Sequence, residues 1–237
     1  MKKMFLILGM LGSLLSLQAQ DVPAATSSSL PVVTVDSVAP KAKYDLSSLF
    51  VSMPDSIVPL LTSVNRADCV DFLASHMKAE VKNRFGKPSE LKQLTKDYLL
   101  LQLTPRSTLS MKLLPVNDSV QVICVVRTVE GPVSDSHIRF YSTDWQALTT
   151  ERFLEVPSAD TFYLPADSLP AGADVSVRAK ADMDLCRADL SPEADRLTFT
   201  YTTPQYLVKD DRQQLQALLK KTPCIYLWKE GRFVRQD

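Results

Sequence analysis

Four short apolar segments in the middle of the chain constrain its fold most. They are residues 98–103, 108–114, 120–126 and 137–141. Apolar and polar side chains alternate along them, for example at Leu109, Met111 and Leu113, as in strands that are buried on one face. The turns between the segments are too short for the crossover helices that parallel strands require. We therefore predict an antiparallel meander and a fold of the α+β class.

A helix is predicted ahead of these strands, from residue 66 to about residue 77. Asn65 is suited to cap its first turn, and Asp68 completes a pattern like a capping box. Its apolar face recurs at helical spacing and is formed by Val70, Leu73, Ala74 and Met77. We interpret this segment as a core helix that packs on the sheet; a partner-binding helix is the alternative.

The residues just before this helix predict two further elements. Residues 49–51 read as the end of a strand, which breaks at residues 53–56. Asp55 or Ser56 is then suited to cap a short helix with Pro59 in its first turn, where a missing N–H is tolerated.

The second half of the chain predicts more strands, which either extend the first sheet or form one of their own. They are residues 161–164, 175–179, 183–190 and 196–203. Residues 144–153 predict a short helix around Trp145. A helix capped by Asp210 and a hairpin of residues 224–228 and 232–234 complete the chain. The hairpin carries Tyr226, Trp228 and Phe233, which either pack across the strands or form a binding platform.

The N-terminus predicts export. Residues 1–19 have the basic start, apolar stretch and small final residue of a signal peptide. The first cysteine is Cys69, so no cysteine lies at the cleavage edge and a lipoprotein is not expected. Residues 20–45 predict a flexible leader, and residues 46–237 an α+β domain that divides into two subdomains, if at all, near residues 145–160. No later segment has the ~20 apolar residues of a membrane-spanning helix.

Several segments resemble a family of exported Bacteroidetes proteins of unknown function. They are Phe50 to Leu61, Asn65 to Asp68, Asp71 to Leu73, Lys96 to Leu99 and Phe140 to Trp145. The resemblance extends from Leu46 to Asp237. It implies a periplasmic or secreted location in an anaerobic gut or oral bacterium, and it brings no known activity and no functional residues.

Composition argues against several classes of function. The 27 basic residues are balanced by 27 acidic ones, so no charge surplus favours nucleic acid. Outside the signal peptide the chain keeps four scattered glycines, and nucleotide-binding loops need glycines close together. His76 and His137 are the two histidines, and a Cys69–His76 pair would be separated by about 10 Å, or two helical turns. No catalytic, cofactor-binding or metal-binding residue is therefore predicted, and no cofactor.

Cysteines and carboxylates leave alternatives open. Cys69, Cys124, Cys186 and Cys224 form no CxxC pair, and we interpret them as buried thiols or, alternatively, as containing one disulfide. Asp182 and Asp184 are predicted on one side of a strand. With Asp189, Glu193 and Asp195 they are compatible with a calcium site, with the acid and base of a glycosidase, or with a solvated edge.

A modification pattern recurs in the chain. Asp-Ser followed by an aliphatic residue looks like the O-glycosylation sequence of exported Bacteroidetes proteins, and it is also an ordinary cap and turn pattern. Its serines are Ser37, Ser56, Ser119 and Ser168.

The leading hypothesis is an exported envelope protein that binds or scaffolds an envelope protein or a surface glycan without catalysing a reaction. The alternative is a secreted hydrolase that uses carboxylates such as Asp182 and Asp184, for example on glycans. The first predicts a shallow apolar patch or an open sheet edge, and the second a deep polar pocket that contains a carboxyl group of raised pKa.

Overall fold

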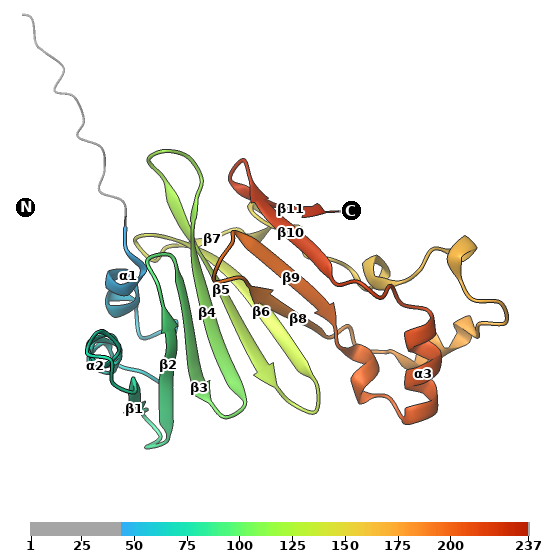
Figure 1. Ribbon diagram of the computed structural model, residues 1–237, viewed down its shortest axis with the longest axis horizontal. Helices are drawn as coiled ribbons and strands as arrows, with labels where there is room; N and C mark the ends of the chain where they lie inside the picture. The colour runs from blue at the N-terminus through green and yellow to red at the C-terminus, as the bar shows by residue number, and fades with distance from the viewer. Residues whose placement is uncertain (1–43, 237) are drawn as a thin grey trace, which may run out of the picture. The chain divides into compact units, whose positions relative to one another are not determined.

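The computed structural model describes residues 44–236 (Figure 1). The predicted signal peptide and almost all of the predicted leader lie outside these residues. Two antiparallel sheets and a small set of helices make up the described part, which confirms the α+β class.

The first sheet is a meander of seven strands that follow one another in chain order. The strands are β1 (Glu80–Lys82), β2 (Pro88–Leu94), β3 (Tyr98–Thr104), β4 (Ser107–Pro115), β5 (Gln121–Glu130), β6 (Ser134–Ser142) and β7 (Ala147–Leu148). All neighbours pair antiparallel. The predicted meander is therefore confirmed, and it extends beyond its four predicted strands.

The second sheet has four strands in the order β11-β10-β9-β8. They are β8 (Cys186–Leu190), β9 (Arg196–Tyr201), β10 (Cys224–Lys229) and β11 (Arg232–Gln236). Its apolar face shares a core with the meander, in which Cys124 and Phe140 pack together with Leu197, Phe199 and Phe233. The later strands thus form a sheet of their own.

The edge strand β8 is tied to β6 by side chains. The backbone N–H of Cys186 donates to Asp135 Oδ1 at 3.1 Å, and that of Ala188 donates to Ser136 Oγ at 2.9 Å. Backbone donors that an edge strand normally presents to solvent therefore have partners within the chain.

Helices α1 (Leu46–Ser52) and α2 (Ser63–Ala74) cover the other face of the meander. Figure 1 shows them beside β1 and β2. Because side chains alternate along a strand, the odd-numbered residues Leu109, Met111 and Ile123 face this helical layer while their even-numbered neighbours face the second sheet. The meander is thereby buried on both faces over much of its area.

A smaller apolar cluster lies around α3 (Lys209–Ala217), where Leu215 and Leu218 pack with Tyr163, Val177 and Leu207. Several short 3₁₀ helices lie in the second half. They are Thr150–Arg152, Ala159–Phe162, Ala166–Ser168, Val175–Lys180 and Thr203–Tyr206.

The predictions for the first helices were partly wrong. Residues 49–51 belong to α1, whose first turn is capped by Asp45, and residues 54–61 form turns instead of a short helix. The cap of α2 is Thr62, and Asn65 is its third residue and bonds back to Thr62 in a capping box. Polar side chains at Thr62 and Asn65 complete the box together, so either is a plausible cap from the sequence alone.

In the second half, the predicted strand at residues 175–179 is a 3₁₀ helix. Of the strand predicted at residues 161–164, the first two residues end a 3₁₀ helix and Tyr163 forms an isolated antiparallel bridge with Leu219. Trp145 lies in the turn between β6 and β7, not in a helix. Val208, not Asp210, occupies the cap position of α3. Strand β8 begins at Cys186, so Asp182 and Asp184 precede it and share no strand face.

Candidate functional site

The face of the meander that the helices cover changes from apolar to basic toward one end of β5 and β6. Along β5 the side chains on this face run from Val125 to Arg127, and along β6 they run from Tyr141 through Arg139 to His137. The strand register places Arg127 opposite His137 and Val125 opposite Arg139. Residues that are about ten positions apart in the sequence therefore form one basic group.

These side chains line a cavity of about 440 Å³, which we call the cationic pocket. Its walls come from the segment 54–57, from β5 and β6, and from Trp145 and Ala147 beyond β6. Such a volume lies within the range of small-molecule sites, about 300–1,000 Å³.

Two hydrogen bonds orient the basic side chains. Arg127 donates from Nη2 to the carbonyl of Ile57, which ties β5 to the segment above it. Arg139 donates from Nε to His137 Nε2 at 3.0 Å. Because Nε2 accepts this bond, the ring proton lies on Nδ1. His137 therefore offers a donor, not an acceptor, at its remaining nitrogen.

The positive charge of the cationic pocket is not compensated within residues 44–236. Neither Arg127 nor Arg139 forms an ion pair there, whereas Arg66, Arg178 and Arg187 each pair with a carboxylate. No aspartate or glutamate is among the residues that line the pocket. The two guanidinium groups give the pocket a net attraction for anions.

Trp145 closes the aromatic end of the pocket in an unusual backbone conformation. Its φ is 61°, a region that bulky residues rarely adopt, and its N–H donates to the carbonyl of Ser142 at 3.0 Å to close the turn. The indole packs against Tyr141, with ring centroids 5.7 Å apart. Its Nε1–H is buried and has no acceptor among residues 44–236. Strained backbone and unsatisfied donors concentrate at functional sites.

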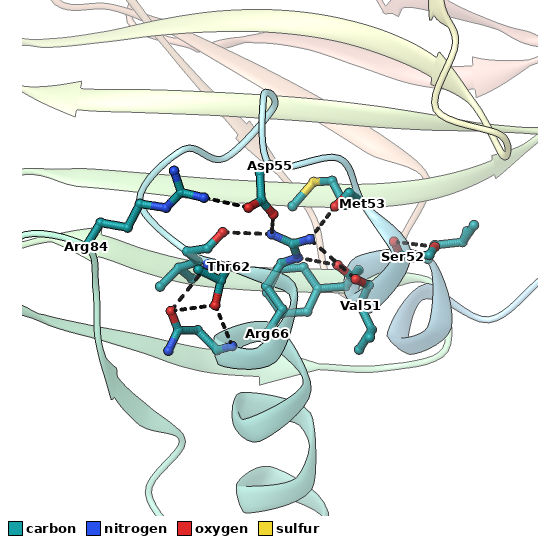
Figure 2. Close-up of polar contacts among 11 residues, drawn as sticks. Val51, Ser52, Met53, Asp55, Thr62, Arg66 and Arg84 are labelled. Carbon is teal, nitrogen blue, oxygen red and sulfur yellow. Dashed lines mark hydrogen bonds and ion pairs between the residues drawn. The ribbon is translucent and has the colours of Figure 1, made fainter.

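A buried arginine holds the segment that forms the opposite wall (Figure 2). Arg66 of α2 is 1% exposed and donates to the carbonyls of Phe50 at 2.9 Å and Leu61 at 2.8 Å, and also to that of Met53. Its guanidinium group forms an ion pair with Asp55, and Arg84 forms a second ion pair with the same carboxylate. The chain on both sides of residues 54–57 is thus fixed to α2.

The carboxylates suggested by the sequence are not brought together in a cavity. Asp182 accepts a hydrogen bond from the Tyr206 hydroxyl at 2.7 Å, and exposed Asp184 accepts one from Tyr201 at 3.2 Å. Asp189 pairs with Arg187 on the surface. No cluster of three or more metal-ligand side chains occurs within residues 44–236.

The four cysteines are free thiols in this structure. Burial raises the pKa of Cys69 to about 11 and that of Cys186 to about 12, and it raises the pKa of Cys124 further. The thiols of Cys69, Cys124 and Cys186 therefore stay protonated and weakly nucleophilic near neutral pH.

The aromatics of the terminal hairpin pack among themselves and against the meander. Trp228 contacts Phe233, with ring centroids 5.0 Å apart, and donates from Nε1 to the carbonyl of Pro115 at 2.6 Å. This supports the packing interpretation. Ser56, Ser119 and Ser168 are exposed, and their modification remains a prediction; Ser37 lies outside the described residues.

Sequence reasoning missed the cationic pocket. In the sequence, His137 is the first residue of the predicted strand 137–141 and Arg127 directly follows the predicted strand 120–126, and neither position predicts a site. The available signal was the alternation of His137, Arg139 and Tyr141 along one strand. That signal becomes a site only once the β5–β6 register is known.

None of the helices within residues 44–236 combines the length and the apolar character that crossing a bilayer requires.

Comparison with known proteins gives a family but no activity. A domain of an uncharacterized protein from Porphyromonas gingivalis W83 is similar to this chain in structure, with a TM-score of 0.73 and 32% identity. The match covers 82% of this chain and 100% of that one. The comparison with curated proteins found no significant match. The family model that matches residues 39–233 is described as a protein of unknown function. This chain therefore belongs to the family of unknown function DUF3256.

Proposed function

We propose that this protein is exported to the cell envelope and works there as a binding module, and that its cationic pocket holds an anionic group of an envelope component. The observation that carries the proposal is a cavity lined by two arginines that form no ion pair within residues 44–236, and by no carboxylate of that part of the chain. The signal-peptide pattern of residues 1–19 supports export.

The electrostatics of the pocket favour binding of an anion. Two guanidinium groups on neighbouring strands repel one another, and a bound anion between them relieves that repulsion. Because the pocket is partly walled by apolar residues, the interaction is screened less than one on an open surface.

The arrangement of His137 suits the binding of an anion. Its Nε2 accepts a hydrogen bond from Arg139, which holds the imidazole beside the guanidinium group. Its Nδ1–H adds a donor to those of the arginines. The imidazole and both guanidinium groups can therefore all donate hydrogen bonds to a ligand that carries several acceptor atoms.

Binding is tested by thermal unfolding and calorimetry of the mature chain with a panel of small organic and inorganic anions at low ionic strength. We expect some anions to raise the melting temperature, an effect that is lost in the R127Q/R139Q double variant. The matched control is R106Q, which removes an exposed arginine from the β3–β4 turn of the same sheet. Anion binding that survives in the double variant, or none at all, contradicts the proposal.

Export is tested separately. Fractionation of the native cell, followed by N-terminal sequencing, is expected to find the chain outside the cytoplasm and cleaved near Ala19. An uncleaved cytoplasmic chain contradicts this part of the proposal.

A further inference from the structure

Resting on the proposed function, we infer that the anionic group held by the cationic pocket is a carboxylate attached to an apolar body. The proposed function requires only an anion. This inference specifies which anion and what it is attached to.

The polarity of the pocket changes in one direction along β6. His137 and Arg139 are exposed at one end, and Tyr141 and Trp145 are buried at the other. Residues 137 and 141 are separated by four strand positions, about 13 Å. A ligand that spans this gradient has a charged head and an apolar body.

The donors at the charged end suit a planar head group. Arg139 uses Nε for His137, and its Nη1 and Nη2 have no hydrogen-bond partner within residues 44–236. These two nitrogens form the end of a flat fork whose spacing matches the two oxygens of a carboxylate. Arg127 keeps further N–H groups beside the one that it donates to Ile57.

Features that usually accompany phosphate sites are absent from the lining of the pocket. Phosphates are commonly held by helix N-termini or by nests of backbone N–H groups in glycine-rich loops. None of the lining residues is a glycine or lies at a helix N-terminus. Along β5 and β6 the backbone is engaged in the strand ladder.

The apolar end supplies the place for the body. Ile57 and Val125 lie near the arginines, and Tyr141 and Trp145 continue the apolar wall.

The test uses three matched series measured by calorimetry with the mature chain. The carboxylates are 3-phenylpropionate, octanoate and glucuronate. Each is compared with its neutral amide and with a phosphate of similar body, namely phenyl phosphate, octyl phosphate and glucose 1-phosphate. We expect 3-phenylpropionate or octanoate to bind at least tenfold more tightly than its amide and its phosphate counterpart, and more tightly than glucuronate.

Variants locate the binding. R139Q is expected to weaken carboxylate binding about tenfold or more, because it removes the guanidinium group that forms the fork. Position 139 is exposed, so the substitution is expected to cost little stability. R106Q is expected to leave it unchanged.

Each other outcome is informative. Equal affinities for acid and amide overturn the inference, as does tighter binding of glucuronate than of both apolar acids. Tighter, Arg139-dependent binding of the phosphates overturns the carboxylate and leaves the proposed function standing. If none of the anions binds, both the carboxylate inference and the proposed anion-binding function are contradicted.

Discussion

Nη1 of Arg66 lies 3.0 Å from Oδ1 of Asp55, although the arginine is 1% exposed and the aspartate lies half in solvent. The same guanidinium group donates to backbone carbonyls of Phe50, Met53 and Leu61. One buried side chain therefore organises the whole connection from α1 to α2, and with it the wall of the cationic pocket.

Replacement of Arg66 by methionine is expected to destabilise the protein by about 3–5 kcal/mol, because it leaves several buried carbonyls without a donor. D55N is expected to cost less, about 1–2 kcal/mol, because the buried guanidinium group loses its carboxylate partner but keeps its carbonyl acceptors. Urea unfolding of both variants measures these values. A loss for D55N as large as that for R66M contradicts the view that the carbonyl contacts dominate.

Lys112 and Asp97 give stability a predicted dependence on pH. Lys112 is 2% exposed, and its Nζ lies 2.9 Å from Asp97 Oδ2 and 3.7 Å from Asp195 Oδ1. Burial by itself raises the pKa of Asp97, but the hydrogen bond and charge of Lys112 outweigh it and the pKa is lowered from 3.8. The contribution of Asp97 is therefore fully present above its unfolded pKa and is lost as the pH falls through its lower folded pKa.

For D97N we expect a loss of about 1.5–3 kcal/mol at neutral pH, because a buried ammonium loses its closest partner. The difference from the wild type is expected to shrink as the pH falls below about 4. K112M is the control, and it is expected to be nearly neutral because the two carboxylates that remain are partly exposed. Urea unfolding between pH 2 and pH 7 checks both, and a difference for D97N that does not change with pH contradicts the assignment.

Trp145 and Trp228 provide a matched pair. W145F removes a buried N–H that has no acceptor within residues 44–236, so we expect a smaller loss of unfolding free energy than in W228F, limited to the packing of the lost ring atoms. W228F removes an N–H that donates to Pro115, so we expect a loss of about 1 kcal/mol. Equal losses in the two variants, measured by urea unfolding, count against an unsatisfied donor at Trp145.

The capping box of α2 makes a fourth prediction. Asn65 N–H donates to Thr62 Oγ1 at 3.2 Å, and Thr62 N–H donates to Asn65 Oδ1 at 3.2 Å. T62A is expected to cost about 1 kcal/mol, and T62S, which keeps the hydroxyl, less than half of that. Thermal unfolding of the two variants provides the measurement, and equal destabilisation would show that the methyl group matters more than the hydroxyl.

The meander was predictable because its strands alternate and its turns are short, so that local pattern and tertiary structure agree. The helix α1 was not, because Phe50 and Val51 favour strands by intrinsic preference while packing of Leu46, Leu49 and Phe50 on the sheet favours a helix. The 3₁₀ helix at residues 175–180 likewise contains valines that read as a strand.

The candidate site was beyond local reasoning for a different reason. Arg127 and His137 are close because the β5–β6 hairpin has one particular register, and a shift by one residue would turn them to opposite faces. Ile57 reaches the same place from the helical layer, seventy positions from Arg127. Contacts between residues so far apart in the chain depend on the whole fold, so the local spacing of residues does not predict them.

The side chains of Asp135 and Ser136 also act against strand addition at the edge of the second sheet. They occupy backbone donors of β8, so a strand from a neighbouring molecule cannot extend the four-stranded sheet at that edge without displacing them. β6 therefore protects this edge of the second sheet against pairing with a strand of another molecule.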